Sequence, residues 1–225
     1  MTANVLAIDG PAGSGKSTTA LAVAERLGFA HLDSGALYRA FTLAAIDAGL
    51  PLGAGARIAA LVRTLPIRLV LGPQGFRPEV AGADVSEAVR RADVTAQVSA
   101  VSALPEVRAV ANDLLREAAA LHPRGVVVDG RDIGTVVFPE APLKIYLSAS
   151  AEARARRRLE QEGRAHDAGS VAEETRRLAA RDRADAGRAI APLRAAADAV
   201  ALDTTDLSFE GQVDAIVELA RNVFS

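Results

Sequence analysis

Short apolar runs alternate with segments of helical spacing along most of the 225-residue chain. Each run has the length of a buried strand. The predicted strands are Val5–Asp9, Phe29–Leu32, Val126–Asp129, Leu143–Leu147 and, more weakly, Ala199–Leu202. Because short buried strands that alternate with helices are typical of parallel sheets, the pattern indicates an α/β fold.

Segments of helical spacing follow the strands. The predicted helices are Ser17–Leu27, Ala36–Ala48, an arginine-rich stretch within 151–188 that breaks near 163–170, and a closing helix from about Phe209 to Phe224. Gly28 follows the first of these and is suited to end it. The stretch Pro66–Asp84 departs from the alternation. Its glycines, prolines and alternating apolar positions predict a small β insert.

Composition narrows the class of protein. The length suits one domain, and half of the residues are hydrophobic, which is enough for a sizeable core. A net charge of −2 gives no basic field of the kind that nucleic acid requires, and the absence of cysteine excludes disulfides and thiolate chemistry. No signal peptide is visible, and no apolar run approaches the roughly 20 residues of a membrane span. We therefore expect a cytoplasmic protein without nucleic-acid or membrane partners.

One bias in the composition singles out a lysine. Of the 26 basic residues only Lys16 and Lys144 are lysines. A lysine kept in a chain that otherwise uses arginine suggests that Lys16 has a role that arginine cannot fill.

Residues 10–17, G-P-A-G-S-G-K-S, fit the phosphate-binding pattern G-x-x-x-x-G-K-[ST], with a strand before it and a helix after it. Backbone N–H groups would surround the phosphates, Lys16 would reach the β- and γ-phosphates, and the Ser17 hydroxyl would bind Mg²⁺. The predicted ATP-binding residues are Gly10, Pro11, Ala12, Gly13, Ser14, Gly15, Lys16, Ser17 and Thr18.

The phosphate-binding loop alone does not decide among P-loop proteins. The chain lacks the N-K-x-D motif that reads guanine, so a GTPase is not favoured. A motor or transport ATPase usually needs a longer chain or a partner. A small kinase needs a second pocket for an acceptor, and the remaining motifs must decide.

Candidate acceptor groups follow in three stretches. In D-S-G-A-L-Y-R, Ser34 is a candidate helix N-cap and Arg39 lies about one turn further on. The two residues either bind a phosphate together, or Ser34 only caps the helix and Arg39 is solvated. Ser99, Ser102 and Arg108 either face a ligand or lie at the surface. Three further residues, Arg181, Asp185 and Arg188, are spaced to share one helix face, either for a ligand or as a salt-bridge ladder.

The stretch V-V-V-D-G-R-D-I-G-T at 126–135 combines two roles. Asp129 ends an apolar strand, as a Walker B carboxylate that holds Mg²⁺ through water does. Ligands of open α/β sheets lie beyond the carboxyl ends of the strands, which is where Asp129 is expected. Asp132 lies on the loop that follows and is expected to point elsewhere.

Taken together, these stretches resemble bacterial cytidylate kinases, which phosphorylate CMP and dCMP. The resemblance rests on G-P-A-G-S-G-K-S-T, D-S-G-A-L-Y-R, A-D-V-S-E-A-V-R, D-G-R-D-I-G-T-V-V-F-P, R-D-R-A-D-A-G-R-A-I-A-P-L and L-D-T-T-D-L-S-F-E, in this order. It implies a single domain over 1–225 with a P-loop NTPase-type five-stranded parallel sheet flanked by helices. It also implies an acceptor-binding region over 35–100, with a small β insert at about 66–84, and a helical lid over 154–171.

The resemblance also implies roles for individual residues. Ser34, Arg39, Arg131 and Arg188 would surround the acceptor phosphate; Ser99, Arg108 and Asp132 would face cytosine; Arg181 and Asp185 would meet the sugar; Arg154, Arg157 and Arg158 of the lid would approach the transferring phosphoryl group. Mg²⁺ would accompany ATP, and the protein would be a monomer. The alternatives are a related kinase with another nucleotide or small anionic acceptor, and a regulatory ATPase without an acceptor.

The base assignment is chemically consistent. Cytosine offers an N4 amino donor with N3 and O2 acceptors, so a carboxylate can accept from N4 while arginine and serine donate to the acceptors. Uracil would place an oxygen against Asp132 and an N–H against a donor. A pocket that leaves polar groups unpaired rejects the wrong ligand strongly.

Overall fold

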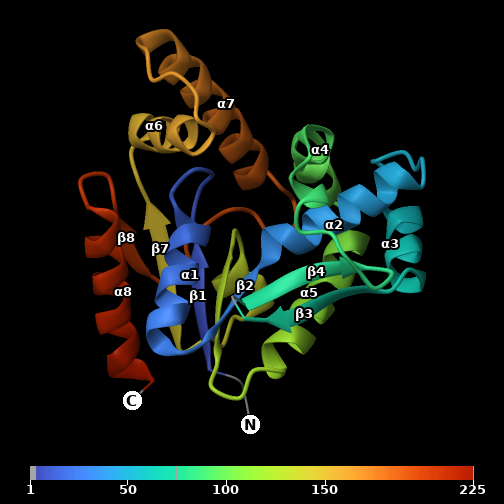
Figure 1. Cartoon of the computed structure of the whole chain (residues 1–225), viewed down its shortest axis with the longest axis horizontal. Coiled ribbons are helices and arrows are strands. Elements are labelled where there is room, and N and C mark those ends of the chain that lie inside the picture. The colour runs from blue at the N-terminus through green and yellow to red at the C-terminus, as the bar shows by residue number, and fades with distance from the viewer. Residues whose placement is uncertain (1–3, 74, 225) are drawn as a thin grey trace.

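A five-stranded parallel sheet forms the centre of the protein. The computed structural model describes residues 4–73 and 75–224; residues 1–3, 74 and 225, which fall within the expected domain and insert, lie outside the described residues. The strands lie in the order β2-β6-β1-β7-β8 (Figure 1). Their bounds are β1 Val5–Asp9, β2 Ala30–Asp33, β6 Val126–Gly130, β7 Leu143–Ser148 and β8 Val200–Asp203. The predicted parallel sheet is confirmed, with several strand ends shifted by one residue.

Side chains along β1 point alternately to the two faces of the sheet, and each face has its own hydrophobic core. Val5 and Ala7 pack into one cluster, and Leu6 and Ile8 pack into the other. Two helices, α1 (Lys16–Leu27) and α8 (Phe209–Val223), cover the face of Leu6 and Ile8, while α2 (Ser34–Asp47) and α5 (Pro105–Ala120) cover the opposite face. Because both faces are covered, β1 and β6 are buried along their whole length and are apolar up to Asp9 and Asp129, which is why they are visible in the sequence.

The β insert forms a separate sheet beside β2. Helix α3 (Gly55–Thr64) leads into β3 (Ile67–Gly72), β4 (Gly75–Val80) and β5 (Ala83–Asp84), which pair antiparallel. The predicted β excursion at 66–84 is therefore confirmed. A short 3₁₀ helix at Ala88–Arg90 then leads into α4 (Ala92–Ser102), which packs against α2.

Two further helices stand beyond the carboxyl ends of the strands (Figure 1). They are α6 (Ala151–Gln161) and α7 (Ala168–Ala186), with their N-termini capped by the side chains of Ser150 and Asp167. After β6 the chain makes a single π-type turn over Ile133–Val137. Within the described ranges, no helix is both long and apolar enough to cross a membrane.

Two local predictions are wrong. Asp33, not Ser34, caps α2, because its carboxylate accepts a hydrogen bond from the Ala36 N–H at 3.1 Å. Helix α7 ends at Ala186, so Arg188 lies beyond it and does not share a helix face with Arg181 and Asp185.

The insert docks on β2 at a point that only glycine fits. Gly75 has a φ of +113°, and a Cβ there would lie 2.5 Å from the backbone oxygen of His31. We expect Gly75→Ala to lower the free energy of unfolding by about 2–4 kcal/mol, through backbone strain and overlap together. Gly82→Ala is the matched control, because Gly82 also has a positive φ but has open space around it. Urea denaturation measures both; equal losses in the two variants would contradict tight docking of the insert.

Candidate active site

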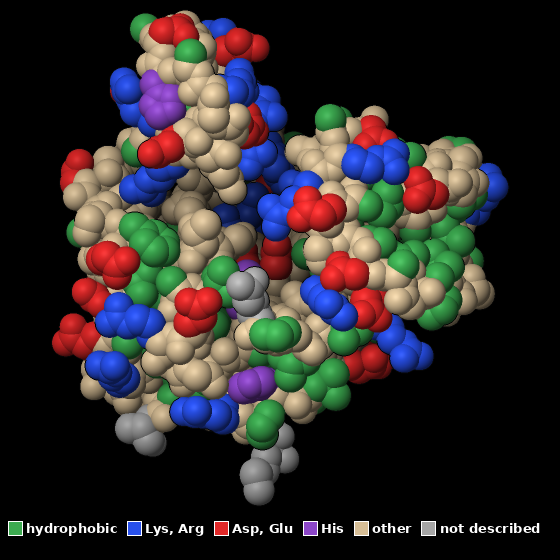
Figure 2. Space-filling model, viewed as in Figure 1, with side chains coloured by type: hydrophobic (Ala, Val, Ile, Leu, Met, Phe, Trp, Pro, Cys, Tyr) green, Lys and Arg blue, Asp and Glu red, His purple; other side chains and the backbone are tan. Residues whose placement is uncertain are grey.

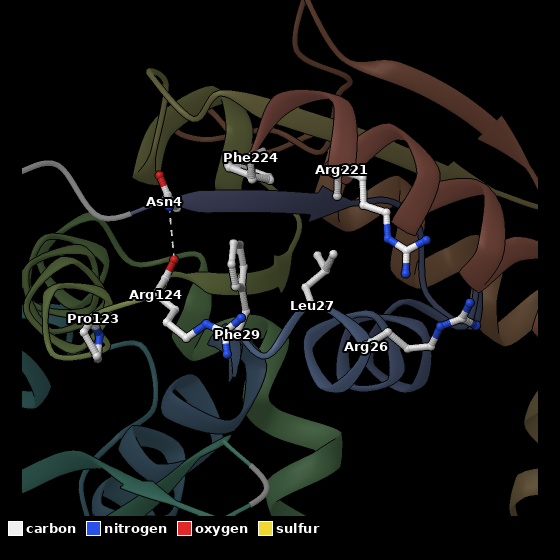
Figure 3. Close-up of a pocket in the computed structure, with 9 residues that line it drawn as sticks. Asn4, Arg26, Leu27, Phe29, Pro123, Arg124, Arg221 and Phe224 are labelled. Atoms are coloured by element: carbon white, nitrogen blue, oxygen red, sulfur yellow. Dashed lines mark hydrogen bonds between the residues drawn. The ribbon is translucent and has the colours of Figure 1, made fainter.

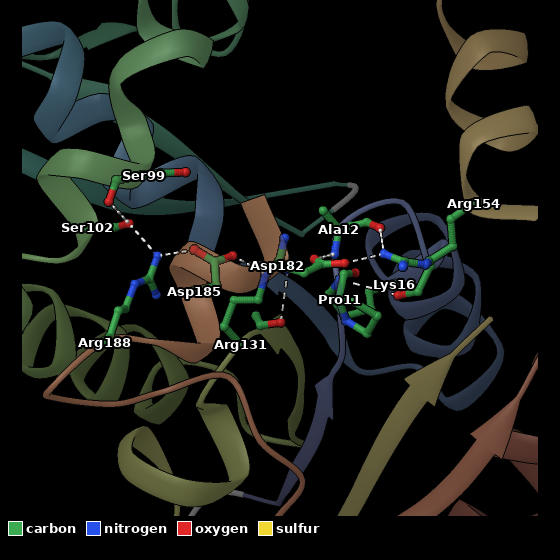
Figure 4. Close-up of polar contacts among 12 residues, drawn as sticks. Pro11, Ala12, Lys16, Ser99, Ser102, Arg131, Arg154, Asp182, Asp185 and Arg188 are labelled. Atoms are coloured by element: carbon green, nitrogen blue, oxygen red, sulfur yellow. Dashed lines mark hydrogen bonds and ion pairs between the residues drawn. The ribbon is translucent and has the colours of Figure 1, made fainter. Parts of the chain in front are cut away.

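The phosphate-binding loop runs from β1 to α1 and depends on glycine. Gly10 has a φ of +156°, and a Cβ there would lie 2.0 Å from the backbone oxygen of Leu147. Lys16 is buried and donates to the backbone oxygen of Pro11 at 2.7 Å (Figure 4). Burial, followed by the charge of Arg131, lowers the pKa of Lys16 well below its usual range. Anionic phosphate beside Lys16 would restore the preference for its charged form.

A hydroxyl and a carboxylate lie together at the end of β6. Ser17 donates to Asp129 Oδ2 at 2.6 Å, and His31 Nε2 lies 2.7 Å from Asp129 Oδ1. Burial opposes ionisation of Asp129, but the contact with His31, together with Ser17 and Lys16, outweighs it and lowers the pKa of Asp129. Mg²⁺ prefers oxygen ligands, such as those of ionised carboxylates and hydroxyl groups. The Ser17–Asp129 pair therefore fits a site for the Mg²⁺ that accompanies a nucleotide.

Asp132 forms a buried ion pair with Arg108, and both side chains are at most 5% exposed. Arg108 also donates to the backbone oxygen of Ser102 at 2.9 Å, and its guanidinium lies 5.4 Å from the centre of the Tyr38 ring. These contacts hold a carboxylate and an arginine in fixed orientations at the inner end of the site. The sequence prediction that Asp132 points away from Asp129 agrees with this pairing.

Asp185 connects two arginines that come from different parts of the chain. Its carboxylate is bonded by Arg131 Nε at 3.0 Å and by Arg188 (Figure 4). Arg188 in turn donates to Ser102 Oγ at 3.1 Å, which links this group to the Arg108 pair. The structure therefore brings together most of the predicted acceptor residues.

Positive charge exceeds negative charge beside Asp185. Within the described residues the Nε of Arg181 is buried without a hydrogen-bond partner. Burial, followed by the charge of Arg131, lowers the pKa of Arg181 to about 10. Burial also lowers the pKa of Arg39, which donates to Thr95 Oγ1 at 2.7 Å. Figure 2 shows Lys and Arg side chains gathered where the surface is hollowed between the α6–α7 unit and α4. Such a concentration of guanidinium groups fits a polyanion.

Ser34 and Ser99 complete the set of predicted acceptor residues. Ser34 is buried and donates to the backbone oxygen of Asp129 at 2.7 Å, so it joins the start of α2 to the end of β6. Ser99 lies half-buried on α4, one turn before Ser102, and its backbone oxygen accepts from the Ser102 hydroxyl at 3.2 Å.

The three predicted lid arginines have different partners. Arg154 donates to the backbone oxygen of Ala12 at 2.9 Å and pairs with Asp182 (Figure 4). Arg157 binds the hydroxyl and backbone oxygen of Thr204, and Arg158 pairs with Glu162 at 2.7 Å. Only Arg154 of the three bonds the phosphate-binding loop in this arrangement.

Several residues of the site have no signal in the sequence. His31 and Asp182 contact partners about 100 residues or more away, Asp129 and Ala12 respectively. Asp182 accepts from the Ala12 N–H at 2.8 Å and so joins α7 to the phosphate-binding loop. For Asp9 the sequence predicts only the end of a strand, and the polar end of an apolar run is its one signal.

An open surface pocket of about 470 Å³ lies at the other edge of the sheet (Figure 3). It is lined by residues at the amino-terminal ends of the strands and the carboxyl ends of helices, among them Asn4, Arg26, Phe29, Arg124 and Phe224. It is therefore separate from the candidate active site, which lies at the carboxyl ends of the strands.

The carboxyl ends of the strands carry a phosphate-binding loop, the adjacent Ser17–Asp129 pair and a second group of basic residues around Asp185. This combination is typical of a small P-loop kinase. The chain belongs to the cytidylate kinase family, whose model, described as cytidylate kinase, matches residues 6–222.

Relatives support this membership over nearly the whole chain. A cytidylate kinase from Nocardia farcinica is 48% identical over 97% of this chain and 93% of its own length. One from Pseudomonas aeruginosa is 46% identical over 95% of this chain and 93% of its own length. The crystal structure of TT1252 from Thermus thermophilus shares the fold, with a TM-score of 0.50 and 20% identity over 98% of both chains.

The charge of Arg181 is unfavourable in the protein without a ligand. We expect Arg181→Met to raise the free energy of unfolding by about 1 kcal/mol, since it removes a charge that burial and Arg131 oppose. The same variant should show a smaller rise of Tm on addition of CMP, because Arg181 is expected to contact the acceptor nucleotide. Arg183→Met is the control, since Arg183 is exposed on the same helix. A loss of stability in Arg181→Met, or an unchanged CMP effect, would contradict the account of the arginine cluster.

Proposed function

We propose that this protein transfers the γ-phosphoryl group of ATP to CMP or dCMP, forming ADP and CDP or dCDP. The observation that carries the proposal is the buried Asp132–Arg108 pair, in which Asp132 follows Asp129 of β6 by three residues. The end of β6 would thus serve the phosphate-binding side, and the loop directly after it the acceptor side. Membership in the cytidylate kinase family supports the same reaction.

On the donor side, residues 10–18 would bind ATP. The backbone N–H groups of the loop would hold the phosphates, and Lys16 would bind the β- and γ-oxygens. Ser17 would bind Mg²⁺ directly and Asp129 through water, and the ion would neutralise charge on the phosphates when bound. The 2.6 Å contact between Ser17 and Asp129 supports this assignment.

On the acceptor side, Ser34, Arg39, Arg131 and Arg188 would hold the phosphate of CMP. Arg181 and Asp185 would contact the sugar. Because the acceptor phosphate is already an oxyanion, no side chain needs to remove a proton from it. The arginines would align the two phosphates and neutralise the negative charge that is spread over the transferring group.

Base selection would follow from hydrogen-bond complementarity. Asp132 would accept from the N4 amino group of cytosine, while Arg108 and Ser99 would donate to N3 and O2. Burial of Asp132 and Arg108 sharpens this selection, because a buried group left without its partner costs more than an exposed one.

The region 35–100, with its insert at 66–84, would bind the acceptor, and the segment 154–171 would act as a lid. Arg154, Arg157 and Arg158 would approach the transferring group when the lid closes and excludes water. We propose further that the protein acts as a cytoplasmic monomer on small nucleotides, without nucleic-acid or membrane partners.

The reaction is tested by measuring ADP release in a coupled assay with CMP, dCMP, UMP, dTMP, AMP and GMP as acceptors. We expect CMP and dCMP to be preferred over the others, because cytosine matches the donor and acceptor pattern of Asp132 and Arg108 and also offers its O2 acceptor to Ser99. A preference for AMP, GMP or dTMP would overturn the proposal in favour of another nucleotide kinase. ATP binding with no transfer to any acceptor would favour a regulatory ATPase.

The base pocket is tested by Asp132→Asn, which keeps the shape of the side chain but adds an amide donor. We expect kcat/KM for CMP to fall at least about tenfold and the ratio of UMP to CMP activity to rise, since the amide can donate to uracil O4. The KM for ATP should change less than about twofold. Asp198→Asn is the control, because Asp198 also pairs with a basic side chain, Lys144, but is largely exposed. If the variant impaired the use of CMP and of ATP equally, the assignment of Asp132 to the base pocket would be wrong.

A further inference from the structure

Asp9 is a buried carboxylate that binding of neither substrate explains. It is the last residue of β1 and directly precedes Gly10, the first residue of the phosphate-binding loop. Its side chain turns toward the neighbouring loop after β6. Oδ1 accepts from the Ile133 N–H at 2.8 Å, and Oδ2 accepts from the Gly134 N–H at 2.7 Å. Both oxygens are therefore engaged by one turn of backbone.

The two N–H groups that Asp9 binds follow immediately after the acceptor-side residues. Arg131 and Asp132 stand directly before Ile133, and the backbone oxygen of Asp132 accepts from the N–H of Val136 at 2.9 Å. Fixing Ile133 and Gly134 therefore fixes the backbone from which Arg131 and Asp132 project. The side chains of these two residues contribute to the contacts with Asp185 and Arg108.

Lys144 supports the same turn from another side. A Cβ on Gly134 would lie 3.1 Å from the Cδ of Lys144, so the lysine stem packs on the turn. The Lys144 ammonium group lies beyond it, donating to the backbone oxygen of Pro139 and pairing with Asp198 at 2.8 Å. The turn is thus enclosed on two sides. Of Asp9 and Lys144, it is Asp9 that accepts from the N–H groups of Ile133 and Gly134 and that also adjoins the phosphate-binding loop.

Burial makes this arrangement unfavourable for a carboxylate in itself. Burial raises the pKa of Asp9 to about 6, although the two backbone N–H groups favour the charged form. Asp9 is 4% exposed. When Asp9 is ionised its two hydrogen bonds are charge-assisted, so they hold the carboxylate and the turn in a defined orientation.

We propose that Asp9 is a positioning residue that holds the Arg131–Asp132 loop against the start of the phosphate-binding loop, and so fixes the acceptor relative to the phosphoryl donor. The proposal rests on the proposed function, since it takes the acceptor to be CMP. Loss of Asp9 should loosen the loop that carries the acceptor contacts, while the loop that binds ATP keeps its own glycines and helix N-terminus.

The test uses Asp9→Asn and Asp9→Ala in the full-length protein. In Asp9→Asn one oxygen acceptor remains and the amide opposes the second N–H; in Asp9→Ala both acceptors are lost. We expect KM for CMP to rise about tenfold or more in Asp9→Ala, with a smaller rise in Asp9→Asn. The preference for CMP over UMP should fall in the same order. The Kd for ATP, titrated without CMP, should stay within about twofold of the wild-type value.

Val217→Ala is the control for a general loss of stability, because Val217 is buried under the opposite face of the sheet in α8. It should lower Tm without changing KM for CMP or the CMP preference. If Asp9→Ala does not fold, Asp9→Asn decides. The proposal is wrong if the variants weaken ATP and CMP binding equally, or if they lower Tm and leave both CMP readouts unchanged. Failure of the proposed function would instead be visible in the wild-type protein, as an absence of CMP phosphorylation.

Discussion

The register between β1 and β6 is the constraint on which the rest of the active site depends. The two strands run parallel, with Ile8 opposite Asp129 and Asp9 opposite Gly130. The phosphate-binding loop and the loop of Arg131 therefore leave the sheet side by side at the same height. Because side chains alternate along a strand, a shift of one residue would turn Asp129 away from Ser17 and toward the opposite face. Close packing opposes such a shift, because Val126 and Val128 fit one core and Val127 fits the other.

Two buried carboxylates order the arginines that this register brings together. Asp132 orients Arg108, and Asp185 orients Arg131 and Arg188. Removing a carboxylate would leave a buried cation unpaired, which costs more than the pair contributes to stability. The pairs are therefore better explained by orientation of the donors than by stability of the fold. Arginine suits this role, because its planar group can bind a carboxylate on one edge and a phosphate on another.

The sequence predicted the sheet, the insert and the phosphate-binding loop because each has a local pattern. Buried strands are continuous apolar runs, and the loop has its glycines at fixed spacing. The predicted N-cap is wrong by one residue because Asp33 and Ser34 are both good caps and only the strand end decides between them. The spacing of Arg181, Asp185 and Arg188 predicts a helix through Arg188, but α7 ends at Ala186. The contacts of Asp9 and Asp182 join residues 124 and 170 positions apart, and no local pattern encodes them.

Helices α6 and α7, which include the proposed lid segment 154–171, are hydrogen-bonded to the phosphate-binding loop at Ala12. The backbone oxygen of Ala12 accepts a hydrogen bond from Arg154 of α6, and the Ala12 N–H donates to Asp182 of α7. Away from Ala12, the buried Glu174 of α7 binds Arg177 at 2.8 Å and lies 3.6 Å from Arg164, which extends from the loop between the two helices. Contacts between α6 and α7 of this kind predict that the two helices move together. Motion of the proposed lid would therefore either break the hydrogen bonds at Ala12 or displace the phosphate-binding loop, which would couple the position of the lid to the geometry of the donor site.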